Sequence, residues 1–361
     1  MAESQMISFQ ASISKGWLHE MGGFEFGEKY YMDPLFRRSQ DMQMHEFIRR
    51  DFKAYPLYNM EANLVQANHR NEKQILIGGI QPNLILAHIL GANFVFYRDK
   101  DMDVSGNPLK YISLAEDLPH IERILQHPFV KELDRQILEL LRIHPELEII
   151  PPFFWDNSGR ATIHGIITTS LKLIGDKAMM MIIMDPDLLH KVHQWITDAY
   201  IVLINHYAAL TDFSIRSIHV GECSGTMISH DQYVEFINPY INELGRNFGH
   251  IRLHSCGFSD HLLKAIDQIE NLNIIDTGSN TSIAKIRQMK GRDFEINVEP
   301  PINLLLKGSS RKDLINWLDK TLKENQGGPM RFGIHIESSY SMENCLSIYD
   351  ELLKRTLIIK S

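Results

Sequence analysis

The feature that most constrains the fold is an alternation of short apolar, β-branched runs with longer segments in which apolar residues recur every three or four positions. The first pattern predicts buried strands and the second predicts amphipathic helices. Strands that alternate with helices pair in parallel, because each helix returns the chain to the same end of the sheet. The strand candidates are Gln74–Gly79, Ala92–Tyr97, Glu148–Phe154, Ser214–Val220, His250–Leu253, Leu272–Asp276, Phe294–Val298 and Arg331–Ile336.

Eight candidate strands suit a closed barrel better than an open sheet, and we predict a (β/α)₈ TIM barrel over residues 71–361. The open dinucleotide-binding sheet is the structural alternative, but the sequence has no Gly-x-Gly-x-x-Gly after a strand. Residues 1–70, in which Asp33–Phe52 has a helical pattern, are expected to form a helical extension that caps the barrel. Further helix candidates are Pro82–Leu90, Pro186–Ala209, Asp231–Asn247, Asp260–Ile269, Ile283–Met289, Arg311–Glu324 and Met342–Arg355.

Charge and cysteine content argue against several classes of partner and location. The net charge is -8 with no block of like charges, which gives no electrostatic reason for binding nucleic acid or an anionic membrane. The longest apolar runs are too short to span a bilayer. Three cysteines are too few for a disulfide framework, and no secretory pattern occurs in residues 1–70. We therefore expect a cytoplasmic protein, and the sequence leaves a homodimer open.

The strongest chemical signal is the segment His254-Ser255-Cys256-Gly257 at the end of a predicted strand. Barrel enzymes build their active sites at the carboxyl ends of the strands. Residues two apart on a strand point to the same side, so His254 and Cys256 can converge on one point. Imidazole nitrogen and thiolate sulfur are ligands that zinc accepts. An isolated His-x-Cys is more often a core histidine beside a buried thiol, but its place at a strand end favours a zinc site.

A zinc site needs further ligands, and two carboxylates are the main candidates. Glu222 ends the neighbouring strand, with Cys223 as an alternative if the turn rotates, and Glu337 follows the last strand. The structural alternatives are that Glu222 caps the helix after Ser229 and that Glu337 pairs with a loop arginine. Cys345 lies in a helical pattern and is expected to be a buried apolar thiol.

Other strand ends supply candidates for handling the substrate. Asp156, Asn157 and Asn280 are expected to orient polar groups, with Asp156, Asn280 and Glu222 as catalytic candidates. Trp155 and Tyr340 are expected to form an aromatic wall, so that Trp155, Asn157 and Tyr340 are the predicted substrate-binding residues.

Several segments together resemble the uroporphyrinogen decarboxylase superfamily and, within it, the corrinoid-dependent methyltransferases. Pro82–Phe96 is similar to the family's "P…A..LGA.v.F" pattern, and Ser113–Leu118 to its "s..eDL" step. His164–Leu189 resembles "GP.t.a..l.G…DPel", and Glu222–Tyr240 resembles "DD.G..lsp..y.EFv.PY". His254–Gly257 matches the "H.CG" that supplies zinc ligands in the methyltransferase branch.

Two departures from the family patterns bear on the activity. The decarboxylase segment "RQAGRYLPEYR", whose arginines hold porphyrinogen carboxylates, is absent, and Gly78-Gly79-Ile80-Gln81 stands in the corresponding region. Thiol-methylating members also carry a ligand cysteine in a "GC" context near the last strand. Here Ile334–Ser339 has no cysteine, so the resemblance implies completion of the shell by Glu337, or by Glu222 and substrate.

The resemblance implies transfer of a methyl group between a small O-, N- or S-linked substrate and a corrinoid carried by a separate protein. Zinc would act as a Lewis acid on the substrate heteroatom. Carboxylate ligands leave a harder metal, which favours the demethylating direction. The alternatives are a metal-free decarboxylase-like lyase, with Asp156 or Glu222 handling protons, and a non-catalytic corrinoid- or tetrapyrrole-binding barrel.

Overall fold

The computed structural model describes residues 6–59, 65–66, 69–70, 73–278 and 280–358. Its strands alternate with helices for most of the chain, as the apolar pattern predicts. The strands are β1 (Ile7–Ile13), β2 (Leu57–Asn59), β3 (Val65–Gln66), β4 (His69–Arg70), β5 (Gln74–Leu76), β6 (Phe94–Val95), β7 (Asp103–Val104), β8 (Glu148–Ile150), β9 (Arg160–His164), β10 (Ser217–Gly221), β11 (His250–Ser255), β12 (Leu272–Thr277), β13 (Glu295–Val298) and β14 (Met330–Ile336).

The main sheet is parallel along most of its width and is curled. Its strand order is β4-β3-β2-β1-β14-β13-β12-β11-β10-β9, and every pair from β2 to β9 in this order is parallel. Strands β5 and β8 form a separate parallel pair. Within the described ranges, no ladder joins that pair to the main sheet. The protein thus has an α/β fold with a curled parallel sheet, and a fully closed eight-stranded barrel stays a prediction.

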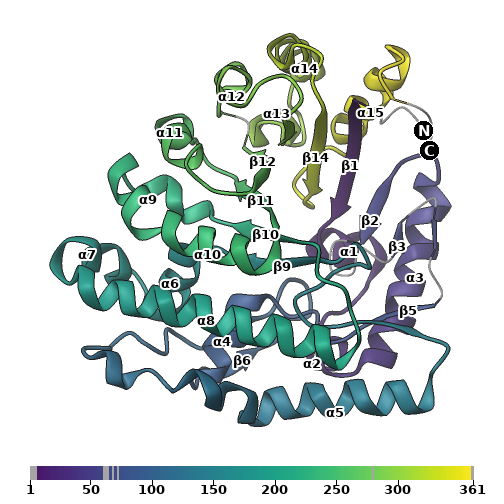
Figure 1. Ribbon diagram of the computed structural model, residues 1–361. Coiled ribbons are helices and arrows are strands. Elements are labelled where there is room, and N and C mark those ends of the chain that lie inside the picture. Colours follow the sequence, from purple (N-terminus) through teal and green to yellow (C-terminus); the bar gives the residue numbers. More distant parts are fainter. Residues whose placement is uncertain (1–5, 60–64, 67–68, 71–72, 279, 359–361) are drawn as a thin grey trace.

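The helices lie mainly along the outer side of the curled sheet, where Figure 1 shows α8 to α12, α14 and α15 following one another around it. The α-helices are α1 (Lys15–Gly22), α2 (Glu28–Met32), α3 (Pro34–Phe52), α4 (Pro82–Ile89), α5 (Pro128–Ile143), α6 (Ile166–Ile174), α7 (Lys177–Met184), α8 (Pro186–Leu210), α9 (His230–Phe236), α10 (Asn238–Phe248), α11 (Leu263–Ile266), α12 (Ile283–Lys290), α13 (Ile302–Leu305), α14 (Arg311–Asn325) and α15 (Met342–Lys354). The 3₁₀ helices are η1 (Ala115–Asp117), η2 (Ile121–Gln126), η3 (Cys223–Met227) and η4 (Asp260–Leu262).

The N-terminal segment contributes more than the expected helical cap. Its helices α1 to α3 are present, but β1 also pairs with β14 over seven residues, from Ile7 opposite Met330 to Ile13 opposite Ile336. Figure 1 shows the purple β1 directly beside β14 from the opposite end of the chain. Residues 1–70 therefore supply four strands of the main sheet, β1 to β4, and not only helices. Strand β1 was not predicted, although the alternation of apolar and polar residues over Ile7–Ile13 is a sequence signal for a half-buried strand.

Other predicted elements also differ from the structure. The candidate Ala92–Tyr97 is wrong as a barrel strand, because β6 within it pairs only with β7, in antiparallel fashion. The predicted helix Asp231–Asn247 is two helices that meet at Ile237. Pro239 accounts for the break, because it has no N–H to continue the first helix and favours the first turn of a new one.

The main sheet presents two different faces, which follow from the alternation of side chains along each strand. On β10 and β11, the residues Ile218, Val220, Ile251 and Leu253 are fully buried under the helices. The residues between them, such as His219 and Arg252, face a cavity on the inner side of the sheet. The core of the protein thus lies between sheet and helices, while the inner face is polar.

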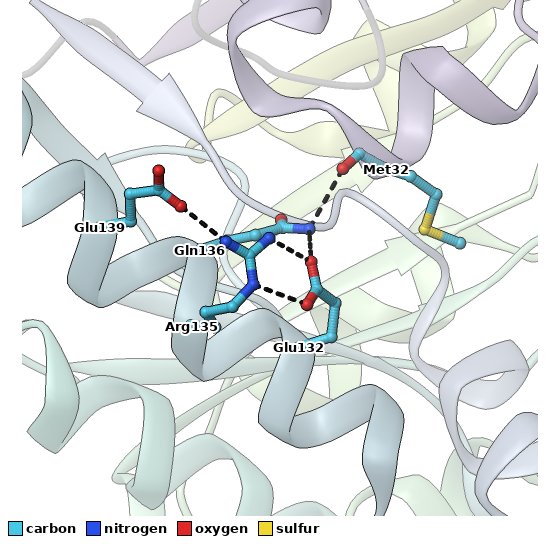
Figure 2. A network of polar contacts seen from close by, with 5 residues as sticks. All are labelled: Met32, Glu132, Arg135, Gln136 and Glu139. Atoms are coloured by element: carbon cyan, nitrogen blue, oxygen red, sulfur yellow. Dashed lines mark hydrogen bonds and ion pairs between the residues drawn. The ribbon is translucent and has the colours of Figure 1, made fainter.

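A polar network on α5 connects the N-terminal helices to the rest of the protein. Figure 2 shows the Gln136 amide donating to the carbonyl of Met32, at the end of α2, and to Glu132, at 3.1 and 3.0 Å. Arg135 bridges Glu132 and Glu139 on the same helix. Because the Arg135 pairs are largely exposed, we assign them a structural role only.

Candidate metal centre

Three potential metal ligands converge where β10 and β11 end. One ligand atom from each of Cys223, His254 and Cys256 lies within 4.8 Å of the other two. His254 is the fifth residue of β11, Cys256 directly follows that strand, and Cys223 opens η3 after β10. Gly221 stands opposite His254 in the ladder, and the Glu222 amide donates to the His254 carbonyl at 2.8 Å. This backbone bond holds the turn that carries Cys223 against the strand that carries His254.

The His254 ring is oriented by a carboxylate on the next strand. Its Nδ1 lies 3.1 Å from the Oδ2 of Asp276, which stands opposite His254 in the ladder. Arg252 also donates to Asp276, at 2.5 Å. Burial opposes ionisation of Asp276, but the charges of Arg252 and His254 hold its pKa well below the usual range. The Nε2 of His254 is therefore the ring nitrogen left for the two cysteines, and a carboxylate behind a histidine is a common support for a metal ligand.

The two thiols differ in their tendency to ionise. The Cys223 thiol donates toward Cys256, and this contact together with His254 lowers the pKa of Cys256 to about 4. The same contact and burial raise the pKa of Cys223 above its usual range. Burial opposes the charged form of His254, but Asp276 and the two cysteines raise its pKa well above 6.5. A polarised set of two sulfurs and one imidazole nitrogen is the donor chemistry that fits zinc.

The structure places Glu222 away from this cluster, with its carboxylate turned to the start of α6. It accepts hydrogen bonds from the amides of Ile167 and Thr168, at 3.3 and 3.0 Å, and from the Thr168 hydroxyl at 2.8 Å. A Cβ at Gly165 would lie 2.2 Å from this carboxylate, so only glycine leaves room for it. Burial raises the pKa of Glu222 to about 7, against these hydrogen bonds. Glu222 thus caps the start of α6. The alternative from the sequence, in which it caps the helix after Ser229, had the correct role but the wrong helix.

The turn that places Glu222 also explains the position of Cys223. Thr168 accepts from the Ser224 amide at 3.1 Å while donating to Glu222, which ties η3 to α6. Strand β10 extends to Gly221, one residue beyond the predicted end at Val220. The sequence left Cys223 as the alternative ligand if the turn rotates. In the structure Cys223, and not Glu222, lies in the cluster with His254 and Cys256.

The second predicted carboxylate, Glu337, also lies apart from the two thiols and His254. Its Oε1 is 3.2 Å from the Nε2 of His335, and this contact lowers its pKa, although burial opposes the effect.

A different carboxylate, that of Glu299, lies closer to His254. Glu299, His254 and Asp276 form a second group whose ligand atoms lie within 4.8 Å of one another. Glu299 follows β13, and burial raises its pKa. The sequence signal that could have identified Glu299 as a site residue is its position directly after the predicted strand Phe294–Val298.

The predicted substrate-handling residues are dispersed. Trp155 lines the inner cavity. Asp156 lies beside the start of β9, with its Oδ2 4.0 Å from Arg160, and Asn157 is exposed. These residues lie at the opposite end of β9 from His164, because Phe154 pairs antiparallel with Ala161 across the turn.

Asn280 and Tyr340 do not line the inner cavity either. Asn280 is exposed and borders a separate hollow that Trp317 of α14 also lines. Tyr340 is half-buried and bridges to Leu306. The structure therefore does not bring Trp155 and Tyr340 together as one aromatic wall. Cys345 is buried in α15, as expected for an apolar thiol.

The inner face of the sheet encloses a cavity of about 490 Å³ that reaches His254. Polar residues from β1, β9, β10, β11, β12, β13 and β14 line it, which is unusual because the interior of such sheets is commonly filled by branched apolar side chains. Its polar lining comprises Gln10, Ser12, Gln81, Arg160, Thr162, His164, His219, Arg252, His254, Asp276, Asn297, Glu299, Arg331 and His335. The cavity is large enough for a small-molecule substrate beside the metal centre.

The fold and the site define an α/β protein with a curled parallel sheet and a candidate metal centre at the strand ends. Residues 161–331 match the family model described as Uroporphyrinogen decarboxylase (URO-D). The matched range contains β9 through the start of β14 and includes the three clustered ligands. This match confirms the resemblance to the uroporphyrinogen decarboxylase superfamily.

The solved structures similar to this chain include two whose alignments cover nearly all of it. A methyltransferase from Methanosarcina mazei has a TM-score of 0.62 at 15% sequence identity, covering 98% of this chain and 95% of the other. At this identity the likeness shows a shared fold. A B12-independent methionine synthase from Shewanella sp. W3-18-1, in complex with selenomethionine, has a TM-score of 0.45 at 10% identity and 98% coverage of both chains. No curated protein sequence matches this chain. No described helix has the length and apolarity needed to cross a membrane.

Proposed function

We propose that this protein is a zinc-dependent methyltransferase in which Cys223, His254 and Cys256 hold the metal. The observation that carries the proposal is the convergence of these three ligand atoms within 4.8 Å of one another at the strand ends. The similarity in fold to a methyltransferase and the family match over residues 161–331 support it. Three protein ligands leave a position for a substrate heteroatom, as in catalytic zinc sites.

When bound, zinc supplies Lewis acidity toward the substrate heteroatom. The protein's own contribution is to fix the ligands. Asp276 accepts from the Nδ1 of His254, which selects the tautomer whose Nε2 faces the cysteines. Arg252 holds Asp276 in turn, and Asp276 is almost fully buried, so this support is rigid and shielded from water. Cys256 is exposed, which leaves the centre accessible from its side.

The ligand set bears on the direction of methyl transfer. The expectation of demethylation depended on carboxylate ligands, whereas the cluster contains two cysteines. Thiolate ligands make a softer site, which suits a substrate sulfur better than an oxygen. We therefore propose a thiol as the methyl acceptor and a corrinoid on a separate protein as the methyl donor. Demethylation of a small O- or N-methyl compound is the second candidate, favoured by the nearness of Glu299 to His254.

Metal analysis and a methyl-transfer assay test the proposal together. The purified protein should contain near-stoichiometric zinc, and His254→Ala and Cys256→Ser should lose it together with methyl transfer from a methylated corrinoid protein. Cys345→Ser is the matched control, because Cys345 is buried in α15, away from the cluster. If the wild-type protein binds no zinc and transfers no methyl group, the metal-free lyase becomes the better proposal. Zinc binding without methyl transfer to any thiol or from any methyl compound would favour the non-catalytic alternative.

A further inference from the structure

We propose that Arg160, Arg252 and Arg331 form an anion subsite inside the curled sheet, which binds an oxyanion group, a carboxylate or a phosphate, of the substrate. The three side chains come from β9, β11 and β14 and line the same cavity of about 490 Å³. This inference rests on the proposed function in one respect, because it assigns the oxyanion to the small molecule that takes part in methyl transfer. The existence of the subsite can be tested without any metal.

The three arginines line one cavity and lie close enough for the charges of Arg252 and Arg331 to act on Arg160. Burial, together with the charges of Arg252 and Arg331, lowers the pKa of Arg160 to about 10. Arginine stays protonated at neutral pH, so three like charges are held close together in a partly enclosed space. An arrangement of this kind is unfavourable unless negative charge enters it.

The cavity does not contain enough negative charge to neutralise them. Its acidic lining residues are Asp276 and Glu299. Asp276 is already shared between Arg252 and His254. Glu299 lies beside His254 and Asp276, since ligand atoms of these three residues lie within 4.8 Å of one another. The other two arginines have long ion pairs with carboxylates outside the lining, Arg160 with Asp156 at 4.0 Å and Arg331 with Glu295 at 3.7 Å.

Arg160 is the clearest sign of an incomplete site. Its guanidinium makes no hydrogen bond to the residues that the structure describes, and its Nε is among their buried polar atoms that have no partner. A guanidinium offers five N–H donors that match the oxygens of a carboxylate or phosphate in pairs. Two histidines on the same inner face, His164 and His219, also have buried Nδ1 atoms for which the described part of the chain provides no partner. Buried polar atoms are normally satisfied, so several together in a hollow indicate a missing polar ligand.

The subsite lies within reach of the metal centre. Arg252 and His254 are two residues apart on β11 and point to the same side, which separates their Cα atoms by about 7 Å. Thr162, His219 and Arg252 stand opposite one another in a row across β9, β10 and β11. A molecule a few bonds long can therefore place its reacting heteroatom at His254 and its oxyanion between Arg160 and Arg252.

The experiment is isothermal titration of the EDTA-treated full chain with sodium phosphate and, separately, sodium propionate in a chloride-free buffer. Thr162→Asp introduces a carboxylate on the face of β9 that carries Arg160, and Thr162→Asn is its uncharged control of nearly equal size. We expect both anions or one of them to bind the wild type and Thr162→Asn. Thr162→Asp should bind at least about tenfold more weakly, because its own carboxylate occupies the site. Binding of phosphate alone would assign a phosphorylated substrate, and binding of propionate a carboxylate.

A second pair of variants removes a cation in place of adding an anion. Arg160→Gln should weaken binding about tenfold, whereas Arg246→Gln, on the exposed side of α10 beside Glu270, should leave it unchanged. Thermal unfolding adds a fold-based measurement, in which Thr162→Asp should melt no lower than Thr162→Asn because the arginines gain a partner. A lower melting temperature for Thr162→Asp, equal binding by all variants, or no binding by the folded wild type would overturn the subsite. None of these outcomes depends on zinc, so they leave the proposed metal centre to its own test.

Discussion

The two faces of the main sheet use neighbouring residues of the same strands for different purposes. On β11, Ile251 and Leu253 point outward and are fully buried against the helices. Arg252 and His254 point inward to the cavity, where they contact Asp276. Burial of the apolar face stabilises the fold, whereas the polar face provides charge and ligands at a cost in desolvation. A substitution on the outer face should therefore lower the stability of the fold and leave the metal site intact. A substitution of its neighbour on the inner face should lower activity and leave stability almost unchanged.

The largest expected effect is the loss of metal-dependent activity in His254→Ala. Removing the imidazole leaves two cysteines to hold the metal, and activity should fall by more than about 100-fold, beyond the loss typical of a changed supporting residue. The stability of the metal-free protein should change little, because His254 faces the cavity. Zinc content, methyl transfer and urea unfolding of the EDTA-treated protein measure the three quantities. Strong destabilisation of the metal-free variant would show that the inner face also supports the fold.

The neighbouring variant Leu253→Ala should show the converse. Leu253 is 1% exposed and packs in the core, so its truncation should lower the free energy of unfolding by about 2–5 kcal/mol. The fraction that remains folded should bind zinc as the wild type does. Urea unfolding followed by circular dichroism gives the first value and metal analysis of the folded fraction the second. Loss of zinc at unchanged stability would contradict the division between the two faces.

A smaller effect is expected from Asp276→Asn, which keeps the shape of the side chain that orients His254. An amide can present its nitrogen in place of an acceptor, and the negative charge is lost, so zinc affinity should fall by about 10–100-fold. Competition with a chromophoric chelator measures the affinity. An unchanged affinity would mean that Asp276 serves Arg252 alone.

The smallest effect is expected at the surface, in the network of Figure 2. Arg135→Gln removes the pairs with Glu132 and Glu139, which are exposed, and should change the free energy of unfolding by less than about 1 kcal/mol. Zinc content and activity should be those of the wild type. A loss of activity here would show that the polar residues of α5 act on the site at a distance.

Much of the fold was predictable because the outward face leaves a strong signal. The runs around Ile218, Leu253 and Ile275 are apolar enough to identify β10, β11 and β12. Strand β9 was missed as a strand, because Arg160, Thr162 and His164 alternate with only two apolar residues and so resemble a loop. The polarity that concealed β9 is what makes it a wall of the cavity.

The site was predictable in part. His254 and Cys256 were predictable as a pair of ligands, because residues two apart on a strand point to the same side and the apolar pattern identifies the strand. The choice between Glu222 and Cys223 depends on the rotation of a 3₁₀ turn and on the room that Gly165 leaves beside α6. Contacts between residues more than fifty positions apart, such as Thr168 with Glu222, decide that rotation. No local pattern contains this information.

The most direct test of the metal centre compares two neighbouring residues, Glu222 and Cys223. Zinc content is measured by mass spectrometry after gel filtration for Glu222→Gln, Cys223→Ser and the wild type, each checked for folding by circular dichroism. We expect near-stoichiometric zinc in the wild type and in Glu222→Gln, since the amide oxygen can still accept from the start of α6, and a large loss of zinc in Cys223→Ser. Retention of zinc by Cys223→Ser together with its loss from Glu222→Gln would contradict the account and assign the carboxylate as the ligand.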